Sequence, residues 1–336
     1  MKTRFFIFSA FLSALIIFPA QTFAEFKQER LFYTSPSKEK QGIADIKKNY
    51  QKIDILAPQV YIVLPNLTVK NQMTAELYKT IQDYNLKTMP LLANDGFNQK
   101  VIHDLLISET AQNNIIDYLV KEGKEKKYIG WQFDFENINY KDKDLFSVFI
   151  EKTAKKLHEN GMIFSVAAVA RITDYENTDH FLNWAGAFDY KRIAEAVDFV
   201  SLMTYDDPNS LGPASSIPFI NSVLAYVKDK IPAEKLSMGI PLYYWGWTIS
   251  PYKRIRSGSG YSRLSMIMQS TPYLSGFIPS LGTAWLAYSY KNFVYLLWHE
   301  NGQSFDLKLN IVKQNNFRGF SAWALGDEDP ALWNLI

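Results

Sequence analysis

The sequence predicts an α/β fold, a closed (β/α)8 TIM barrel with a small α+β insertion between its seventh and eighth strands. Three observations support this prediction. Apolar runs typical of strands alternate with helical patterns, the runs number eight, and their spacing breaks once, between the last two. Repeated βα units favour a parallel sheet, and eight of them favour a closed barrel over the alternative, a doubly wound open sheet.

The expected strands are short apolar runs rich in β-branched and aromatic residues. In chain order they cover residues 31–33, 59–64, 88–92, 129–135, 163–169, 199–203, 236–242 and 319–324. Apolar residues with helical spacing predict helices over residues 74–84, 108–122, 144–158 and 217–227. The gap before the last strand contains shorter aromatic runs at residues 284–290, 293–299 and 303–311, which we expect to be strands of the insertion. The insertion would span about residues 247–313 and form one wall of a cleft above the barrel.

Composition and the N-terminus indicate an exported protein. The chain of 336 residues is 47% hydrophobic, enough for a full core, and its net charge of +2 includes no dense basic stripe, so nucleic acid is not an expected partner. Residues 1–24 contain two basic residues, then an apolar run, then a small-residue site that ends at Ala24. We interpret them as a secretory signal peptide, because a membrane anchor needs about 20 apolar residues. The mature chain, residues 25–336, is expected in a periplasm or outside the cell.

The residue inventory predicts no metal or cofactor site. The four histidines are scattered without ligand spacing, and cysteine is absent, so disulfides and a lipid-modified N-terminal cysteine are not expected. We therefore expect a monomer without a metal, a cofactor or a membrane anchor, whose stability comes from its core.

The most informative segment is YIGWQFDFEN, residues 128–137. Alternate side chains of a strand point to opposite faces, so Gln132, Asp134 and Glu136 share one face and the aromatic residues between them share the other. Two neighbouring carboxylates are costly to bury, so a core strand that carries them normally turns them toward a cleft. The alternative is an edge strand whose polar face meets solvent. Active sites of these barrels lie at the carboxyl ends of the strands, which favours the cleft.

Three further motifs follow this segment in barrel order. IGWQFDFE at residues 129–136 is followed by MTYD at 203–206, GIPLY at 239–243 and GFSAW at 319–323. Together they resemble strands four, six, seven and eight of the family 18 glycoside hydrolases, the family of chitinases and related N-acetylglucosaminidases. The family's fourth strand has the pattern D-G-x-D-x-D-x-E, so Ile129 and Gln132 replace its first two acids. DFEN and the ending WALGDEDPALW are most similar to the spore-cortex and peptidoglycan branch.

The resemblance implies a retaining hydrolysis of β-linked N-acetylglucosamine in a polysaccharide, with the substrate's acetamido group as the nucleophile. It makes Glu136 the general acid and base and Asp134 the group that orients the acetamide. It also implies that Tyr205 contacts the acetamide, that Asp206 bonds a sugar hydroxyl and that Trp323 forms the apolar floor of the site. Burial and the neighbouring carboxylate should raise the pKa of Glu136, as the acid role requires.

Further residues are expected around this site. Gln132 replaces an acid, and its amide could still hydrogen-bond the aspartate two positions later. Tyr243 begins an aromatic cluster at residues 243–247, for which stacking on sugars and packing of the insertion are equally consistent interpretations. Asn94 and Arg171 follow the third and fifth strands and are candidates for the cleft.

Two questions of function remain open at the level of sequence. Peptidoglycan is the favoured substrate, with chitin and N-linked glycans as alternatives. The alternative to an enzyme is a lectin-like barrel that binds carbohydrate without cleaving it, because a fold does not by itself imply activity. Retention of Glu136 favours the enzyme.

Overall fold

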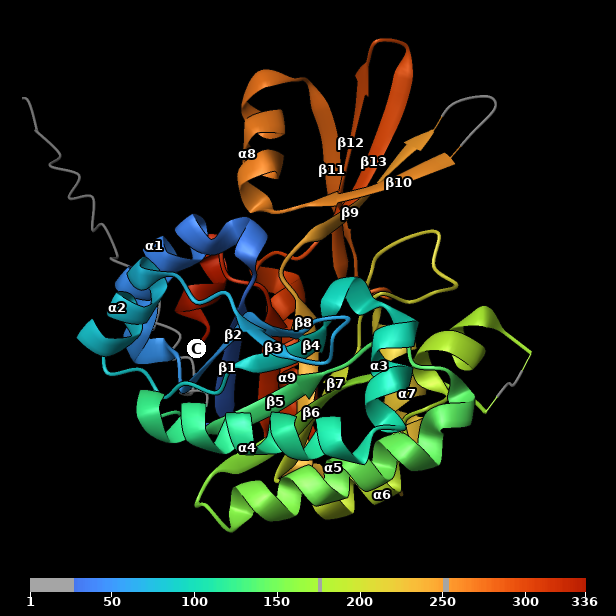
Figure 1. Cartoon of the computed structure of the whole chain (residues 1–336). Coiled ribbons are helices and arrows are strands. Elements are labelled where there is room, and N and C mark those ends of the chain that lie inside the picture. The colour runs from blue at the N-terminus through green and yellow to red at the C-terminus, as the bar shows by residue number, and fades with distance from the viewer. Residues whose placement is uncertain (1–26, 175–176, 250–253) are drawn as a thin grey trace, which may run out of the picture.

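A closed barrel of parallel strands forms the body of the molecule (Figure 1). The computed structural model describes residues 27–174, 177–249 and 254–336, so the expected signal peptide, residues 1–24, lies outside the described residues. The barrel strands are β1 (Glu29–Thr34), β2 (Ile55–Val63), β4 (Leu91–Asn94), β5 (Gly130–Asp134), β6 (Ile163–Val169), β7 (Phe199–Met203), β8 (Leu236–Pro241) and β14 (Gly319–Trp323). β1 pairs with both β2 and β14, which closes the sheet, and β3 (Val69–Asn71) runs antiparallel to β2. The barrel and its eight predicted strands are confirmed.

Helices cover the outside of the barrel. They are α1 (Glu39–Asn49), α2 (Ala75–Asp83), α3 (Gln99–Leu106), α4 (Glu109–Lys126), α5 (Lys143–His158), α6 (Tyr190–Ala196), α7 (Ile217–Val227) and α9 (Gly302–Gln314). The four predicted helices are confirmed as α2, α4, α5 and α7. Thr74, Ser108 and Ser216 cap α2, α4 and α7 by accepting a backbone N–H. Across the described residues, no helix has the length and apolar character needed to cross a membrane.

The alternation along β5 separates the core from the barrel interior. Trp131, Phe133 and Phe135 are fully buried on the outer face, where Phe133 stacks on Phe149 of α5 with ring centroids 5.3 Å apart. The residues between them point into the barrel, because strand side chains alternate between faces. A shift of one residue would exchange the two faces, so the outer aromatic packing fixes which side chains reach the interior.

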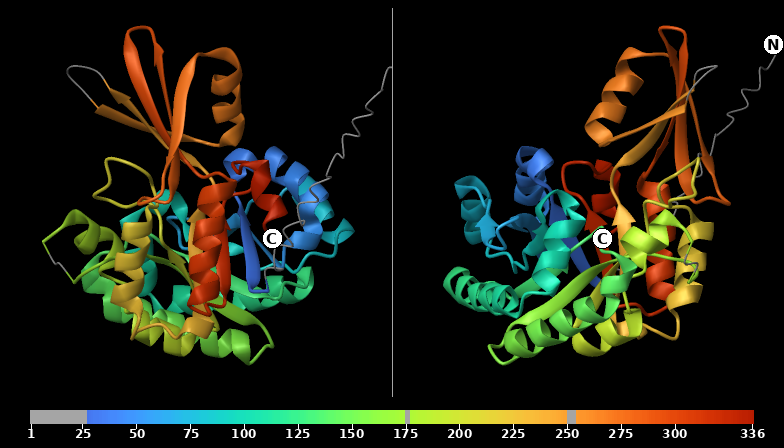
Figure 2. Two further views of the ribbon diagram at one scale, coloured as in Figure 1. Left: turned by 180° about the vertical axis from the view of Figure 1, so that it is seen from behind. Right: turned by 45° about the vertical axis from the view of Figure 1, so that its right-hand side comes forward.

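The insertion is a second, antiparallel sheet that stands over the barrel (Figure 2). Its strands, in spatial order, are β10 (Arg254–Ser259), β9 (Tyr244–Ile249), β13 (Phe293–His299), β12 (Thr283–Tyr290) and β11 (Tyr273–Ile278). Helix α8 (Tyr261–Ser270) packs on this sheet, where Leu264 contributes to a small core with Leu286 and Leu297. The insertion between the seventh and eighth barrel strands is thus confirmed.

One expected strand of the insertion is wrong. Residues 303–311 lie within α9, which begins with a capping box at Asn301. Phe305, Leu309 and Val312 recur with helical spacing and are buried in the main core. The preceding aromatic strands biased the prediction toward another strand, whereas the cap and the apolar spacing both specify a helix. α9 therefore belongs to the barrel, and the insertion sheet ends with β13.

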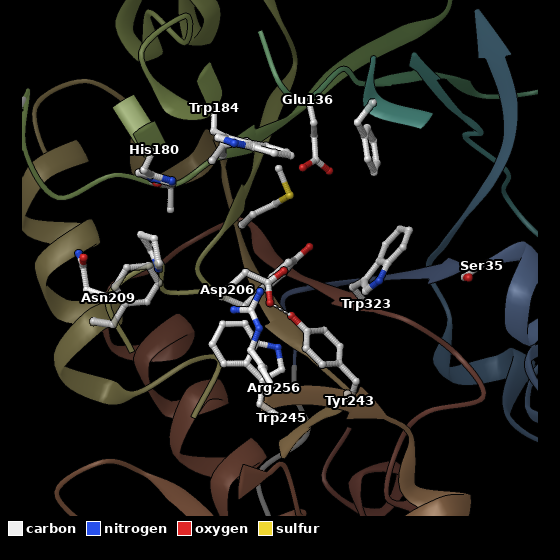
Figure 3. A pocket seen from close by; sticks show the side chains of 18 of the residues that line it. Ser35, Glu136, His180, Trp184, Asp206, Asn209, Tyr243, Trp245, Arg256 and Trp323 are labelled. Carbon is white, nitrogen blue, oxygen red and sulfur yellow. Dashed lines mark hydrogen bonds between the residues drawn. The ribbon is translucent and has the colours of Figure 1, made fainter. Parts of the chain in front are cut away.

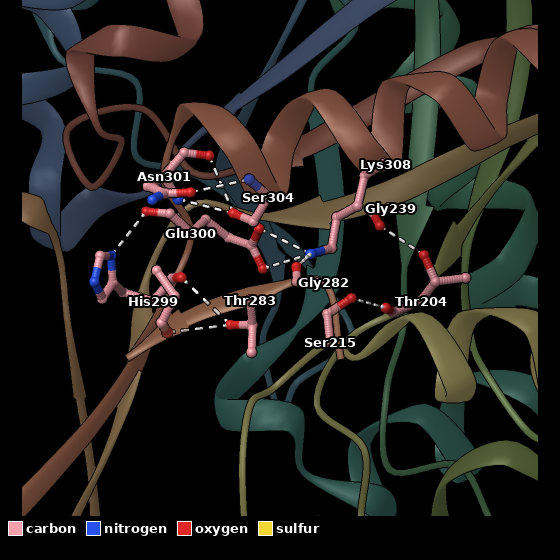
Figure 4. Close-up of polar contacts among 11 residues, drawn as sticks. Thr204, Ser215, Gly239, Gly282, Thr283, His299, Glu300, Asn301, Ser304 and Lys308 are labelled. Atoms are coloured by element: carbon pink, nitrogen blue, oxygen red, sulfur yellow. Dashed lines mark hydrogen bonds and ion pairs between the residues drawn. The ribbon is translucent and has the colours of Figure 1, made fainter. Parts of the chain in front are cut away.

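A buried ion pair joins the insertion to this helix (Figure 4). Lys308 of α9 is fully buried, and its Nζ lies 2.8 Å from each carboxylate oxygen of Glu300, the residue that follows β13. The same Nζ is 3.5 Å from the carbonyl oxygen of Gly282, between β11 and β12. Two connections of the insertion therefore converge on one side chain of the barrel.

We predict that Lys308→Met lowers the free energy of unfolding by about 3–5 kcal/mol, because it leaves the Glu300 carboxylate buried without its partner. Chemical denaturation would measure the change. Lys79→Met is the control, since it removes the exposed Lys79–Asp83 pair of α2 and should change stability by less than about 0.5 kcal/mol. Equal losses in the two variants would contradict the anchoring role.

Candidate active site

A pocket of about 1010 Å³ lies at the carboxyl ends of the barrel strands, and β9 and β10 of the insertion contribute to its lining. Figure 3 shows side chains that line it. Five residues predicted from the sequence line it, namely Glu136, Tyr205, Asp206, Tyr243 and Trp323. Further lining residues follow β1 and β6 or belong to the insertion, among them Ser35, Lys38, His180, Trp184, Trp245 and Arg256. Most of the predicted site therefore converges on one cavity.

Asp134, the last residue of β5, is 3% exposed and, like Gln132 and Asn94, is not among the residues that line this pocket. Burial raises the pKa of its carboxyl to about 6, and a hydrogen bond opposes the rise. The donor is Nε2 of Gln59 on β2, 3.0 Å from Asp134 Oδ2. Gln59 was not among the predicted site residues, although a glutamine within an apolar strand signals a polar position inside the barrel.

Glu136 faces the pocket two residues beyond Asp134. Burial raises the pKa of its carboxyl well above the usual value, and the charges of Asp134 and Asp206 raise it further. Asn94 holds the backbone of Glu136 from β4: its Oδ1 accepts from the Glu136 N–H at 3.1 Å, and its Nδ2 donates to the Glu136 carbonyl at 3.0 Å. Asn94 is itself 2% exposed and does not line the pocket, so its predicted cleft contact is replaced by a supporting role.

Gln132 is fully buried inside the barrel. Its Oε1 accepts from the Tyr33 hydroxyl at 2.8 Å, and its Nε2 donates to the hydroxyls of Ser165 at 2.7 Å and Ser201 at 3.0 Å. The expected bond to Asp134 is wrong, because both amide groups are engaged by other strands. Gln132 does not line the pocket, so the structure does not support its predicted contact with the sugar. Together with Tyr33, Ser165 and Ser201 it forms a neutral polar layer inside the barrel.

Asp206 and Tyr243 form the side of the pocket across from Glu136 (Figure 3). The Tyr243 hydroxyl donates to Asp206 Oδ1 at 2.5 Å, and the Tyr243 ring meets that of Tyr205 edge to face with centroids 6.4 Å apart. Burial raises the pKa of Asp206, while the bond from Tyr243 and the charge of Arg256 oppose the rise. Asp206 has a left-handed backbone, with φ of 57°, which directs the chain out of β7 and over the pocket.

Tryptophans from three parts of the chain line the pocket. Trp323 lies at the end of β14, Trp245 on β9 and Trp184 in the connection that follows β6. Trp184 was not predicted, because that connection contains no motif. The aromatic cluster after β8 divides between two places: Tyr243 and Trp245 line the pocket, whereas Trp247 packs the insertion by donating to the Gly212 carbonyl at 3.3 Å.

Arg171 does not reach the pocket, so its predicted cleft role is wrong. Its Nε donates to the Tyr226 hydroxyl at 3.0 Å, its Nη1 donates to the Phe188 carbonyl at 3.2 Å, and its Nη2 lies 3.0 Å from Asp174 Oδ1. These bonds turn the side chain toward the outer helices, where it stabilises the connection after β6.

The chemistry available in the pocket is acid–base chemistry. Burial raises the pKa of both carboxyl groups, that of Asp134 to about 6 and that of Glu136 well above its usual value, and a raised pKa is what a proton donor requires. Within the described ranges, no group of three histidine, cysteine, aspartate or glutamate side chains could hold a metal ion. The tryptophans supply apolar faces on which a sugar ring can stack.

Comparisons with known proteins relate the chain to glycosidases. The family model "Glycosyl hydrolases family 18" matches residues 16–329. The "Uncharacterized glycosylase YvbX" of Bacillus subtilis is 28% identical over 262 residues, which cover 75% of this chain and 74% of that protein. The "Cortical fragment-lytic enzyme" of the same species is 27% identical over 282 residues, which cover 82% of this chain and 63% of that enzyme.

Solved structures share the fold. The spore cortex-lytic enzyme SleL of Bacillus megaterium superposes with a TM-score of 0.80 at 25% identity, over 92% of this chain and 73% of that chain. A chitinase from Chromobacterium violaceum gives the same TM-score of 0.80 at 22% identity, over 92% of this chain and 98% of that chain. Both similarities extend over the barrel and the insertion together.

We predict that Gln59→Leu raises the pKa of Asp134 above about 6, because it removes the hydrogen bond that stabilises the carboxylate. An NMR titration of the side-chain carboxyl carbons would measure the shift. Gln82→Leu, an exposed substitution on α2, is the matched control and should leave the titration unchanged. An unchanged or lower pKa in Gln59→Leu would show that the bond does not control the acid.

Proposed function

This chain belongs to the glycosyl hydrolases of family 18, and on that premise we propose that it cleaves β-linked N-acetylglucosamine in a glycan with net retention. The single observation that carries the proposal is the placement of Glu136, a carboxyl of raised pKa that faces the pocket directly above the buried Asp134. A protonated acid at that position can protonate the leaving oxygen of a glycosidic bond, a step worth about 10²–10⁴-fold in rate.

The nucleophile in this proposal is the acetamido oxygen of the substrate. Asp134 ends β5 and Glu136 follows two residues later, so the two cannot flank a sugar ring as the two carboxylates of most glycosidases do. As the acetamide attacks, Asp134 would orient its N–H and stabilise the positive charge that develops there. Glu136 would then act as a base and activate the water that opens the oxazolinium ring.

The remaining pocket residues position the sugar. Trp323 and Tyr205 both line the pocket. In this proposal Trp323 offers an apolar face for the sugar ring, and the Tyr205 hydroxyl donates to the acetamide oxygen. Asp206, fixed by Tyr243, can accept from a sugar hydroxyl. The neutral Gln132 contributes by holding the strand ends beneath them through its bonds to three other strands.

We propose peptidoglycan as the physiological glycan, in preference to chitin or N-linked glycans. The support comes from the similarity to the cortical fragment-lytic enzyme of Bacillus subtilis and to the spore cortex-lytic enzyme SleL. Cleavage after Ala24 would release residues 25–336 as an exported monomer, which could then reach a cell wall. An open pocket of about 1010 Å³ also leaves room for a substituted sugar.

We predict that Glu136→Gln lowers turnover of a fluorogenic N-acetylglucosaminide by at least about 100-fold, because the isosteric amide cannot donate the proton, and leaves ligand affinity nearly unchanged. Initial rates and calorimetric binding would measure the two effects. Retention of turnover within about tenfold of the wild type, about 1.4 kcal/mol of barrier, would remove Glu136 from the acid role.

We predict that a matched glucoside, which lacks the acetamido group, is not hydrolysed, and that the wild type releases a product with the anomeric configuration of the substrate. NMR spectra recorded during the reaction would identify the first anomer formed. Hydrolysis of the glucoside at a similar rate would instead favour a carboxylate nucleophile such as Asp206, and an inverted anomer would exclude the retaining mechanism.

We predict that the mature protein releases soluble fragments from purified peptidoglycan sacculi faster than from chitin oligomers or N-linked glycoproteins. Mass spectrometry of the new reducing ends would identify the bond cleaved, with Glu136→Gln as the inactive control. If fragments are released from chitin or glycoproteins while the sacculi stay intact, peptidoglycan is rejected as the substrate, but the proposed hydrolytic mechanism is not.

A further inference from the structure

The charges that line the pocket are unevenly paired. Four carboxyl side chains and two strong cations line it, namely Glu136, Asp179, Asp206, Asp327, Lys38 and Arg256. Lys38 forms an ion pair with Asp327, with Nζ and Oδ1 2.9 Å apart. Arg256 forms no ion pair with any residue that the structure describes, although its charge lowers the pKa of the nearby Asp206. One guanidinium in the wall therefore keeps its hydrogen-bond donors available.

Packing holds this guanidinium at the pocket. Arg256 lies on β10, and its Cζ is 4.2 Å from the ring centre of Trp245 on β9. The residue directly opposite Trp245 is Gly258, which has no side chain to displace the arginine from the indole. Figure 3 shows the guanidinium beside Trp245 and near Asp206. A guanidinium that stacks on an aromatic face directs its N–H groups outward in its own plane, where they can bind a carboxylate or a carbonyl.

The pocket needs such a group only for some ligands. An unsubstituted β-linked N-acetylglucosamine chain is neutral and requires no cation. A chain whose sugars carry acidic substituents would be repelled by the pocket carboxyl groups unless a cation compensates. The two-point geometry of an arginine also matches a carboxylate better than a lysine does.

We propose that Arg256 binds the free carboxylate of a 3-O-lactyl substituent, as on a peptidoglycan sugar that carries no peptide, on a sugar next to the N-acetylglucosamine that is cleaved. This inference rests on the proposed function and adds a specificity-determining residue to it. The insertion, and not the barrel, then distinguishes a lactyl-substituted chain from chitin. The catalytic acid acts on either chain.

The test measures binding to the full mature chain carrying Glu136→Gln, so that no ligand is consumed. Isothermal titration would compare a tetrasaccharide of alternating N-acetylglucosamine and N-acetylmuramic acid, with free lactyl carboxylates, and chitotetraose. Arg256→Met should weaken binding of the first by about 10- to 100-fold, the range for a hydrogen bond to a charged group, and change that of the second by less than about twofold. Arg256→Lys should restore only part of the loss.

Arg263→Met on α8 is the matched control, because it removes one exposed positive charge from the same insertion outside the pocket. Equal weakening of both ligands by Arg256→Met, no weakening of either, or the same loss in Arg263→Met would each overturn the inference. If one of these results is found and the wild type hydrolyses chitotetraose, the role of Arg256 is rejected and the glycosidase proposal is retained. Binding of neither tetrasaccharide, together with hydrolysis of neither by the wild type, would reject both.

Discussion

The site depends on the desolvation of two carboxyl groups, those of Asp134 and Glu136, which lie two residues apart in the chain. Desolvation is the largest cause of the raised pKa of both Asp134 and Glu136. Two buried carboxylates cannot both remain ionised without compensation, so the barrel provides a fixed amide dipole for one of them through Gln59. For Glu136, the charges of Asp134 and Asp206 add to the effect of desolvation and raise its pKa further. The two carboxyl groups therefore differ because a hydrogen bond opposes the rise in pKa at Asp134 alone.

The neutral layer below the acids explains how the site differs from the family pattern. An acid at position 132 would place a third ionisable group in the barrel interior. Gln132 instead completes hydrogen bonds to Tyr33, Ser165 and Ser201, which lie on three other barrel strands. A buried polar network in which every member is bonded is rigid, whereas a partly satisfied one is unstable. Glutamine at position 132 therefore removes a charge from the barrel interior while the hydrogen-bonded network stays complete. Desolvation and the hydrogen bond from Gln59 then set the pKa of Asp134.

Sequence patterns predicted the parts of the molecule that depend on local periodicity. The barrel strands, the alternation of β5 and the acids at its end all follow from a period of two and from motif order. Trp184 and Arg256 could not be found in this way, because they lie in the connection after β6 and in the insertion, where no motif marks them. Gln59 stands out as a glutamine within an apolar strand, but only the folded barrel brings it to Asp134. Arg171 was correctly predicted to follow a barrel strand. Its side chain nevertheless points away from the pocket, because it bonds Tyr226 and Asp174.

The two parts of the molecule contribute different groups to one pocket. The barrel supplies the acids, and the insertion supplies Trp245 and Arg256 above them. Trp245 and Arg256 face the pocket only if the insertion keeps one orientation on the barrel. Apolar contacts are not directional, so they alone would allow the insertion to slide. The Lys308–Glu300 pair is directional and buried, so any tilt of the sheet would separate two charges out of reach of water. A specific orientation of the insertion, and with it the selectivity of the pocket wall, is thus maintained by an interaction that contacts no substrate.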